Sequence, residues 1–347
     1  MPVLQPPAVP PPGPVAINAA LIAVRQAAQV LCDRATLLVL LHAHCGACRY
    51  AEFSEQTGLA SRILSARLAQ LTEDGLLVRI PYSRRPLRHA YHLTHMGVAL
   101  FDVLALLVTW EQAWPGPDGV NRVAQVMHLG CQSTNCQAGA TTTVRMHCAA
   151  CGEPVTAREI ALRVSQTEMA KMPTKSTSTR RTSQETGYKT GDSASPVPQG
   201  LAVLGDKWSI EVLVCAHFGI RQFGDFGTRT GISTNILADR LNRLVDGGLL
   251  RRSTGEGRHR KGLYLLTSKG LEFYPILIVI QSWADQWIDH RIRSPVKLSH
   301  MPCRKVLQPL LVCTGCEQPI SYAQGKIRMT TPAAANAGVP DPASDTR

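Results

Sequence analysis

In residues 204–290, apolar side chains recur at helical spacing and predict three helices in close succession. The segments Trp208–Phe218 and Phe223–Arg229 form the first two. A tight turn at Gly231–Ser233 follows, and Ser233 is the expected N-cap of the third helix. This helix runs to Asp246 and carries leucines on one face, so one side is buried and the other faces solvent.

The pattern then changes to that of a hairpin. Two glycines end the third helix, and short strands are expected around Leu249–Arg252 and Leu263–Leu266, joined by a polar and basic connection. Thr267 is placed to cap a final apolar helix over Gly270–His290. Three helices, a basic hairpin and a fourth helix form one small domain.

The first half of the chain repeats the second. Residues 31–114 align with residues 204–287 at a constant offset and without a gap, and about a third of the positions are identical. Residues Thr36 to Trp114 follow the same order of predicted elements. The repeated unit is too long for a solenoid repeat, so a whole small domain has been copied once.

The second copy contains four motifs that resemble the HxlR-type family of bacterial transcription regulators, at Gly205–Trp208, Gln222–Phe226, Gly231–Leu249 and Tyr264–Gly270. The first copy resembles the family through Leu64–Leu76 and Tyr91–Gly97, although Cys32 and Ala35 stand where the second copy has Gly205 and Trp208. The resemblance implies two tandem winged helix-turn-helix domains, mainly α with small β-wings (an α+β fold), that bind operator DNA.

The predicted division of the chain follows from these patterns and from composition. A proline-rich tail (1–17) and a small-residue tail (330–347) are expected to be disordered, and a Ser-, Thr- and Lys-rich segment (165–195) is expected to be a flexible linker. The winged helix-turn-helix copies occupy 18–120 and 196–293, and a small extension that we expect to bind zinc follows each copy, at 121–164 and 294–329.

Charge and cysteine content narrow the class of partner. The chain has 37 Lys and Arg against 25 Asp and Glu, a net charge of +12, which favours an anionic partner. Eleven cysteines without an export signal indicate thiols or metal ligands rather than disulfides. No apolar run reaches the ~20 residues of a membrane span. We therefore expect a cytoplasmic, nucleoid-associated protein with no membrane partner.

The third helix of each copy is expected to enter the major groove with its polar face. The wing tips are expected to contact phosphates, which adds affinity that falls with salt. Arg67 and Arg240 lie beside the leucine stripe, and we expect them to pair with Glu52 and Asp225 of the second helix instead. The predicted DNA contacts are Ser61, Arg62, Ser65 and Ala66 with Arg84, Arg85 and Arg88 in the first copy, and Thr234, Asn235, Ala238, Asp239 and Asn242 with Arg258, His259, Arg260 and Lys261 in the second.

Each copy ends in a His-x2-Cys and a Cys-x2-Cys pair, a ligand set for tetrahedral zinc. We expect two structural Zn²⁺ sites, one per copy, with Cys136 as a substitute ligand in the first. The predicted ligands are His128, Cys131, Cys148 and Cys151 in the first copy, and His300, Cys303, Cys313 and Cys316 in the second.

Cys45 and Cys48 form a further Cys-x2-Cys pair that occurs in the first copy alone, and it is a candidate redox pair. Neither a nucleophile–base pair nor an open metal site is found, so no enzymatic activity is expected. The favoured interpretation is a regulator whose two copies form an intramolecular pseudo-dimer on an imperfect inverted repeat of duplex DNA. The alternatives are a winged-helix module that binds proteins, or a thiol- or metal-responsive regulator with the first copy as sensor; a higher oligomer also remains open.

Overall fold

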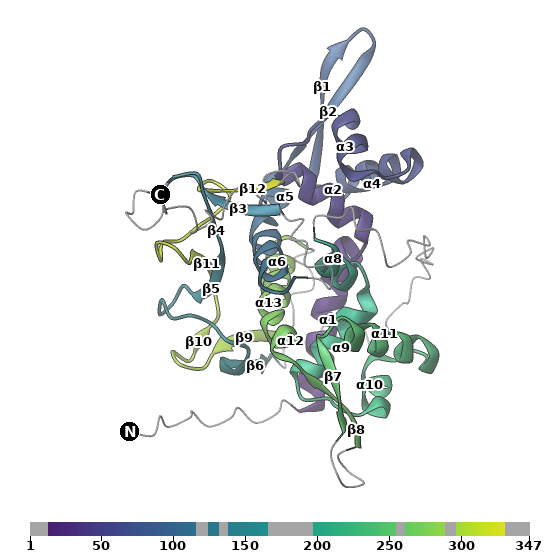
Figure 1. The fold of residues 1–347 in the computed structure, drawn as a ribbon, viewed down its shortest axis with the longest axis vertical. Helices are drawn as coiled ribbons and strands as arrows, with labels where there is room; N and C mark the ends of the chain where they lie inside the picture. The colour runs from purple at the N-terminus through teal and green to yellow at the C-terminus, as the bar shows by residue number, and fades with distance from the viewer. Residues whose placement is uncertain are drawn as a thin grey trace, which may run out of the picture.

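The computed structural model describes residues 13–115, 124–131, 138–165, 197–254, 261–288 and 296–329 (Figure 1). Five parts of the predicted organisation lie outside these residues: the predicted linker after Ser165, most of the predicted N-terminal tail, the C-terminal tail, Cys136 and the tip of the second wing (255–260).

Each copy has the predicted order of helices and hairpin. The first copy contains α1 (Pro14–Leu31), α2 (Arg34–His44), α3 (Tyr50–Thr57), α4 (Ser61–Glu73), β1 (Leu77–Arg84), β2 (Leu87–Leu93), α5 (His95–Val98) and α6 (Phe101–Ala113). The second contains α8 (Pro198–Leu204), α9 (Lys207–His217), α10 (Phe223–Thr230), α11 (Thr234–Asp246), β7 (Leu250–Thr254), β8 (Lys261–Leu266), α12 (Ser268–Glu272) and α13 (Tyr274–Trp287). The mixed α+β fold is confirmed.

Local chemistry explains the helix ends. Asp33 and Asp206 cap α2 and α9, accepting hydrogen bonds from the backbone N–H of Thr36 at 2.8 Å and of Ser209 at 3.0 Å. Gly231 ends α10 in the left-handed conformation, with φ 71°, which brings the chain sharply into α11. Ser233 does occupy the N-cap position of α11, but its side chain makes no capping hydrogen bond.

Two predicted boundaries are wrong. Helix α1, which precedes the three predicted helices of the first copy, begins at Pro14, so residues 14–17 are its first turn rather than part of a disordered tail, since proline is tolerated at the first helical position. The last helix of the second copy is divided, because Thr267 caps the short α12 and α13 starts anew at Tyr274 with Pro275 in its first turn.

The two copies share one hydrophobic core. Helix α1 of the first copy packs on α9 and α13 of the second, α8 of the second packs on α2 and α6 of the first, and α6 contacts α13. Two equivalent tryptophans make matching bonds across this contact. Trp110 Nε1 donates to the carbonyl oxygen of Lys269 and Trp283 Nε1 to that of Met96, both at 3.0 Å.

The extensions form a layer of short strands on the side of α6 and α13 that faces away from α4 and α11 (Figure 1). These strands are β3 (Ala124–His128), β4 (Ala140–Thr142), β5 (Val144–Cys148) and β6 (Ile160–Val164), and β9 (Val296–His300), β10 (Lys305–Val306), β11 (Pro309–Cys313) and β12 (Gly325–Met329). Three antiparallel pairs join the copies, namely β3 with β12, β5 with β11 and β6 with β9. Each extension therefore completes its sheets with strands of the other copy rather than as a unit of its own.

One helical stretch was missed as a membrane-span candidate. Residues His95–Ala113 are long and apolar enough to cross a bilayer by length and composition. Most of this stretch, which comprises α5 and α6, is buried within the protein, where α6 contacts α13, α8, β3 and β5. A buried core helix of a globular protein passes the same test.

Candidate nucleic-acid interface and metal centres

Helix α4 presents the polar face that the sequence predicts. Leu64, Leu68 and Leu71 are buried in the hydrophobic core, where α4 packs on α2, and this leaves the opposite face in solvent. Ser61, Arg62, Ser65 and Ala66 are all exposed. Tyr50 of α3, which the sequence analysis did not single out, donates a hydrogen bond from its hydroxyl to the Ser61 carbonyl oxygen at 3.2 Å and lies 3.4 Å from the Ser65 hydroxyl.

Helix α11 exposes a different set of groups. Thr234, Asn235 and Asn242 are exposed, and Ala238 and Asp239 are half-buried. The Asp239 carboxylate already pairs with Arg240 and, at 2.9 Å, with Arg243. The Asn242 side-chain oxygen accepts a hydrogen bond from Arg252 of β7 at 2.6 Å. Among the predicted contacts on α11, Thr234 and Asn235 are therefore the polar side chains most available to a partner.

Arg252 was missed by the sequence analysis, although a signal for it existed. It is one of the positions that are identical in the two copies, where the first copy has Arg79. Its guanidinium also lies 5.5 Å from the ring centroid of Tyr264, another such position. Arg252 thus ties the wing to the third helix.

The predicted partners of Arg67 and Arg240 are wrong. Arg67 Nε lies 2.8 Å from the Asp33 carboxylate, and Arg240 Nε lies 2.7 Å from that of Asp206. These aspartates cap α2 and α9, so each third helix is anchored to the first helix of its copy. Glu52 instead accepts backbone N–H bonds at the start of α3.

Asp33 and Asp206 also meet each other. Their backbones form an antiparallel bridge at equivalent positions of the two copies. Each aspartate caps a helix and pairs with an arginine of a third helix. The backbone bridge between the copies is therefore connected to α4 through the Arg67–Asp33 ion pair and to α11 through the Arg240–Asp206 ion pair.

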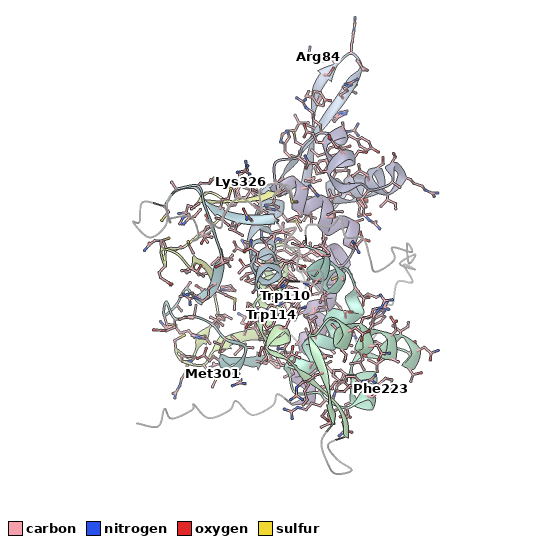
Figure 2. All side chains as sticks on the ribbon, viewed as in Figure 1. Arg84, Trp110, Trp114, Phe223, Met301 and Lys326 are labelled. Carbon is pink, nitrogen blue, oxygen red and sulfur yellow. The ribbon has the colours of Figure 1, made fainter. Side chains whose placement is uncertain are left out.

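Arg84, Arg85 and Arg88 of the first wing are exposed, and Figure 2 shows Arg84 at the far end of that wing. Helices α4 and α11 lie on the same side of the molecule in Figure 1, and the two wings extend toward opposite ends. The predicted contacts Arg258, His259 and Arg260 lie outside the described residues, as does the side chain of Lys261.

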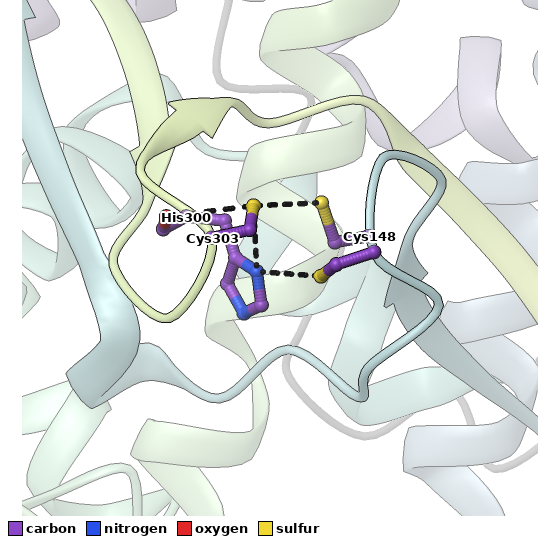
Figure 3. A group of neighbouring side chains, drawn as sticks. Cys148, His300 and Cys303 are labelled. Atoms are coloured by element: carbon purple, nitrogen blue, oxygen red, sulfur yellow. Dashed lines mark hydrogen bonds between the residues drawn. The ribbon is translucent and has the colours of Figure 1, made fainter.

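One metal-ligand cluster contains Cys148, Cys151, His300 and Cys303, whose ligand atoms all lie within 4.8 Å of one another (Figure 3). The Sγ atoms of Cys148 and Cys303 are 3.9 Å apart, and the His300 Nδ1 atom is 3.3 Å from Cys151 Sγ and 3.6 Å from Cys303 Sγ. Cys148 and His300 are fully buried.

A second cluster contains His128, Cys313 and Cys316, also within 4.8 Å. The His128 Nδ1 atom is 3.5 Å from Cys316 Sγ. Cys131 packs against Cys313 and Cys316 and is buried, so the fourth predicted ligand lies beside the cluster.

The predicted grouping of ligands by copy is therefore wrong. Each cluster combines the Cys-x2-Cys pair of one copy with the His-x2-Cys pair of the other. The cause is the strand pairing, because β5 and β11 end in Cys148 and Cys313 and run antiparallel between the copies. What the clusters share is the capacity to hold a metal ion.

Several groups stabilise thiolates in these clusters. Burial alone would raise the pKa of Cys313, but the Thr142 hydroxyl and the amides of Gly315 and Cys316 lower it to about 6. The Thr142 oxygen lies 3.0 Å from Cys313 Sγ. The pKa of Cys303 is lowered chiefly by the backbone amide of Lys305. Amides that face sulfur in this way are those expected of a metal-binding turn.

Cys45 and Cys48 have a different environment. Burial raises the pKa of Cys45 to about 12, and burial together with the Glu52 carboxylate raises that of Cys48. Since the thiolate is the reactive form of cysteine, neither thiol is activated at neutral pH.

The HxlR-like helix-turn-helix family matches residues 30–118 and 203–292, which together make up more than half of the chain. The chain is 31% identical over 125 residues to Rv3095, an uncharacterised HTH-type transcriptional regulator of Mycobacterium tuberculosis, covering 36% of this chain and 79% of the relative. It is 32% identical over 95 residues to MJ0925 of Methanocaldococcus jannaschii, another uncharacterised HTH-type regulator, covering 26% of this chain and 83% of the relative.

Two solved structures are similar in sequence to part of the chain. The first is the crystal structure of PA1607, described as a candidate transcription factor, whose sequence is 30% identical to this one. The match covers 38% of this chain and 93% of the PA1607 chain, with a TM-score of 0.34. PA1374 from Pseudomonas aeruginosa, described likewise, is 27% identical and covers 36% of this chain and 86% of its own, with a TM-score of 0.30.

The family match and the curated relatives place the molecule among the helix-turn-helix transcriptional regulators. The chain belongs to the HxlR-like helix-turn-helix family, as a tandem duplication of the family's domain.

Proposed function

We propose that the chain is a sequence-specific regulator that binds double-stranded DNA, and that its two copies act as an intramolecular pseudo-dimer on an imperfect inverted repeat. The observation that carries this proposal is the pair of third helices, α4 and α11, whose polar faces are exposed while a shared core joins the copies. Two such helices on one body match the two half-sites of an operator.

The roles of the side chains follow from their chemistry. Arg62 can bond guanine and Asn235 can bond adenine, each through two hydrogen bonds to the base edge. Ser61, Ser65 and Thr234 add shorter polar contacts, and Ala66 and Ala238 allow close approach to the groove. The basic side chains of the wings bind phosphates without regard to sequence, namely Arg84, Arg85 and Arg88 in the first wing and Arg258, His259, Arg260 and Lys261 in the second.

Zn²⁺ is the ion that we propose for the Cys/His clusters. Thiolates and imidazoles are the ligands of structural zinc, and sets of three cysteines and one histidine occur among its closed four-coordinate sites. The ion has no catalytic role in this proposal, because all four positions are taken by protein ligands.

A second candidate function is protein binding through the first wing. Val78, Ile80 and Leu87 on this wing are 42%, 46% and 64% exposed, so the wing presents several apolar side chains to solvent. An apolar surface of this kind is typical of protein contacts.

Titration of labelled duplexes with the full chain tests the proposal. Sequences selected from a random duplex pool are expected to bind with dissociation constants on the order of nanomolar at moderate salt, and affinity is expected to fall steeply as salt rises. Micromolar binding that ignores sequence and salt would contradict DNA regulation and favour protein binding.

A further inference from the structure

Both metal-ligand clusters take ligands from both copies of the domain, in the same pattern. One combines Cys148 and Cys151 of the first copy with His300 and Cys303 of the second. The other combines His128 of the first copy with Cys313 and Cys316 of the second, beside Cys131. Each copy thus gives its Cys-x2-Cys pair to one cluster and its His-x2-Cys pair to the other.

The distances fit a tetrahedral zinc ion. Zn–S bonds of about 2.3 Å and Zn–N bonds of about 2.0–2.1 Å place two sulfur ligands about 3.8 Å apart and a sulfur and a nitrogen about 3.5 Å apart. The Sγ atoms of Cys148 and Cys303 are 3.9 Å apart. The three sulfur-to-nitrogen distances in the two clusters, at 3.3, 3.5 and 3.6 Å, agree equally well. A disulfide would need sulfurs about 2.05 Å apart.

The backbone around the ligands is held in the shape of metal-binding turns. Arg304 and Glu317 follow the second copy's two pairs and adopt φ of 58° and 57°, a conformation that costs energy for residues other than glycine. Glu317 N–H bonds the Cys313 carbonyl oxygen at 2.9 Å, and Arg304 N–H bonds that of His300 at 2.7 Å. Gly152 takes the same conformation after Cys151, with φ 79°.

The clusters lie at the two ends of one pair of strands. In the antiparallel pairing of β5 with β11, Cys148 is opposite Pro309 and Cys313 is opposite Val144. Two further strand pairs between the copies lead to the histidines, since β3 ends at His128 and pairs with β12, and β9 ends at His300 and pairs with β6. The ligand atoms are therefore brought together by the contact between the copies.

We propose that two Zn²⁺ ions cross-link the two copies, each bound by the Cys-x2-Cys pair of one copy and the His-x2-Cys pair of the other. This deepens the proposed zinc binding and is independent of DNA binding. The strand layer that holds the ions packs on α6, α13 and α1, the helices through which the copies share their core. Zinc thereby fastens the copies on the side of the core away from α4 and α11.

Paired substitutions in the full chain decide which ligands belong together. Cys151→Ser with Cys303→Ser removes ligands from one proposed site and from both copies, and it is expected to lower zinc from two ions per chain to one. Cys303→Ser with Cys316→Ser removes ligands from a single copy but from both proposed sites, and it is expected to leave none tightly bound. Sites confined to each copy would give the reverse order, and this result would overturn the proposal.

The control is Cys45→Ser with Cys48→Ser, which also removes two thiols and is expected to keep two zinc ions. Zinc per chain is measured by elemental analysis and native mass spectrometry after exchange into buffer without chelator. Wild-type protein that carries no zinc would overturn the proposal, whereas loss of DNA binding with two zinc ions retained would overturn only the regulatory function.

A second measurement uses wild-type protein and therefore does not depend on whether the variants fold. Zinc is withdrawn stepwise with a chelator, and newly reactive cysteines are alkylated and identified in peptides. Cys303 is expected to become reactive together with Cys148 and Cys151, and Cys316 together with Cys131 and Cys313. Reactivity that appears copy by copy, with Cys131, Cys148 and Cys151 together, would contradict the cross-link.

Discussion

Single side chains on α4 and α11 divide into those that face solvent and those that hold the helix in place. Arg62 and Asn235 are exposed, whereas Arg67 and Arg240 pair with the aspartates that cap α2 and α9. Each of these two helices thus carries one polar residue that faces solvent and one arginine that anchors the helix. The sequence separates these roles only by which side of the leucine stripe each residue lies on.

Arg62→Ala and Asn235→Ala are each expected to change base preference in one half-site, because each removes a bidentate contact worth about 1–3 kcal/mol of discrimination. Arg84→Ala with Arg88→Ala is expected to weaken all duplexes about equally and to reduce the salt dependence. Selection of bound sequences and salt titrations measure the two effects. Identical behaviour of the two classes of variant would refute the assignment of helix and wing.

Arg240→Met is expected to lower the free energy of unfolding by about 2 kcal/mol, since it leaves the Asp206 carboxylate without its charged partner. The Arg240 side chain is only 11% exposed, so solvent cannot replace the lost contact well. Arg243→Met is the matched control, because Arg243 pairs with Asp239 while 52% exposed, and exposed pairs contribute about 0–1 kcal/mol. Urea denaturation of both variants gives the comparison, and equal losses would contradict the anchoring role.

At the scale of elements, α2 and α9 each end with a histidine at equivalent positions, of which His44 is buried and His217 is half-buried. Burial lowers the pKa of His44 to about 4 and that of His217 to about 3. The His44 ring nitrogen Nε2 lies 3.0 Å from the Gly97 carbonyl oxygen, and the His217 ring stacks on Tyr274 with centroids 4.3 Å apart. Both helices are therefore packed with neutral imidazoles.

This burial has a defined consequence for pH. An unfolded histidine titrates near 6.5, so between pH 6.5 and about 4 the unfolded chain binds more protons than the folded one. Stability is expected to be full above pH 6.5 and to fall below it, by up to about 1.4 kcal/mol per pH unit for each histidine. His217→Gln should reduce this slope relative to wild type in urea melts between pH 7.5 and 5. An unchanged slope would contradict burial of a neutral ring.

The elements within each copy were predictable, and their partners were not. Leucine spacing, turn glycines and capping residues are local, so α9, α10, α11 and the wing strands lie close to their expected bounds. The pairing of β5 with β11 joins segments far apart in the chain. In a duplicated chain, ligand pairs of either copy satisfy the same local pattern, so spacing cannot distinguish sites within a copy from sites between copies. The sequence indicates the eight candidate ligands, which the structure brings together in two clusters, but it does not indicate their grouping.

For the whole molecule, the contacts between the copies are reciprocal but not identical. The two tryptophans make equivalent hydrogen bonds. Arg25 of α1, in contrast, donates a hydrogen bond to Glu211 of α9 at 2.7 Å that has no equivalent in the part of the chain that the structure describes. The position that corresponds to Arg25 in the second copy is Pro198, and the position that corresponds to Glu211 in the first copy is Leu38. Glu111 instead accepts the Gly200 N–H at 2.8 Å at the start of α8. We therefore expect a first copy to associate with a second copy in preference to a like copy.

This asymmetry leads to the expectation that one chain occupies both halves of its operator, and that the operator is an imperfect inverted repeat. A homodimer presents the same helix twice, whereas in the proposed binding mode this chain would offer Ser61, Arg62, Ser65 and Ala66 to one half-site and Thr234, Asn235, Ala238 and Asp239 to the other. Half-sites centred about one DNA turn apart, roughly 34–36 Å, would suit two third helices on one body.

Native mass spectrometry of the complex with a minimal selected duplex measures this expectation. One chain per duplex is expected, and replacing either half-site by a copy of the other should weaken binding, because one helix then meets bases that suit the other helix. Fusion keeps the copies together at an effective concentration on the order of millimolar, so dilution should not change this stoichiometry. Two chains on a single minimal site, or selection of a perfect palindrome, would show instead that like copies from two chains meet on the DNA.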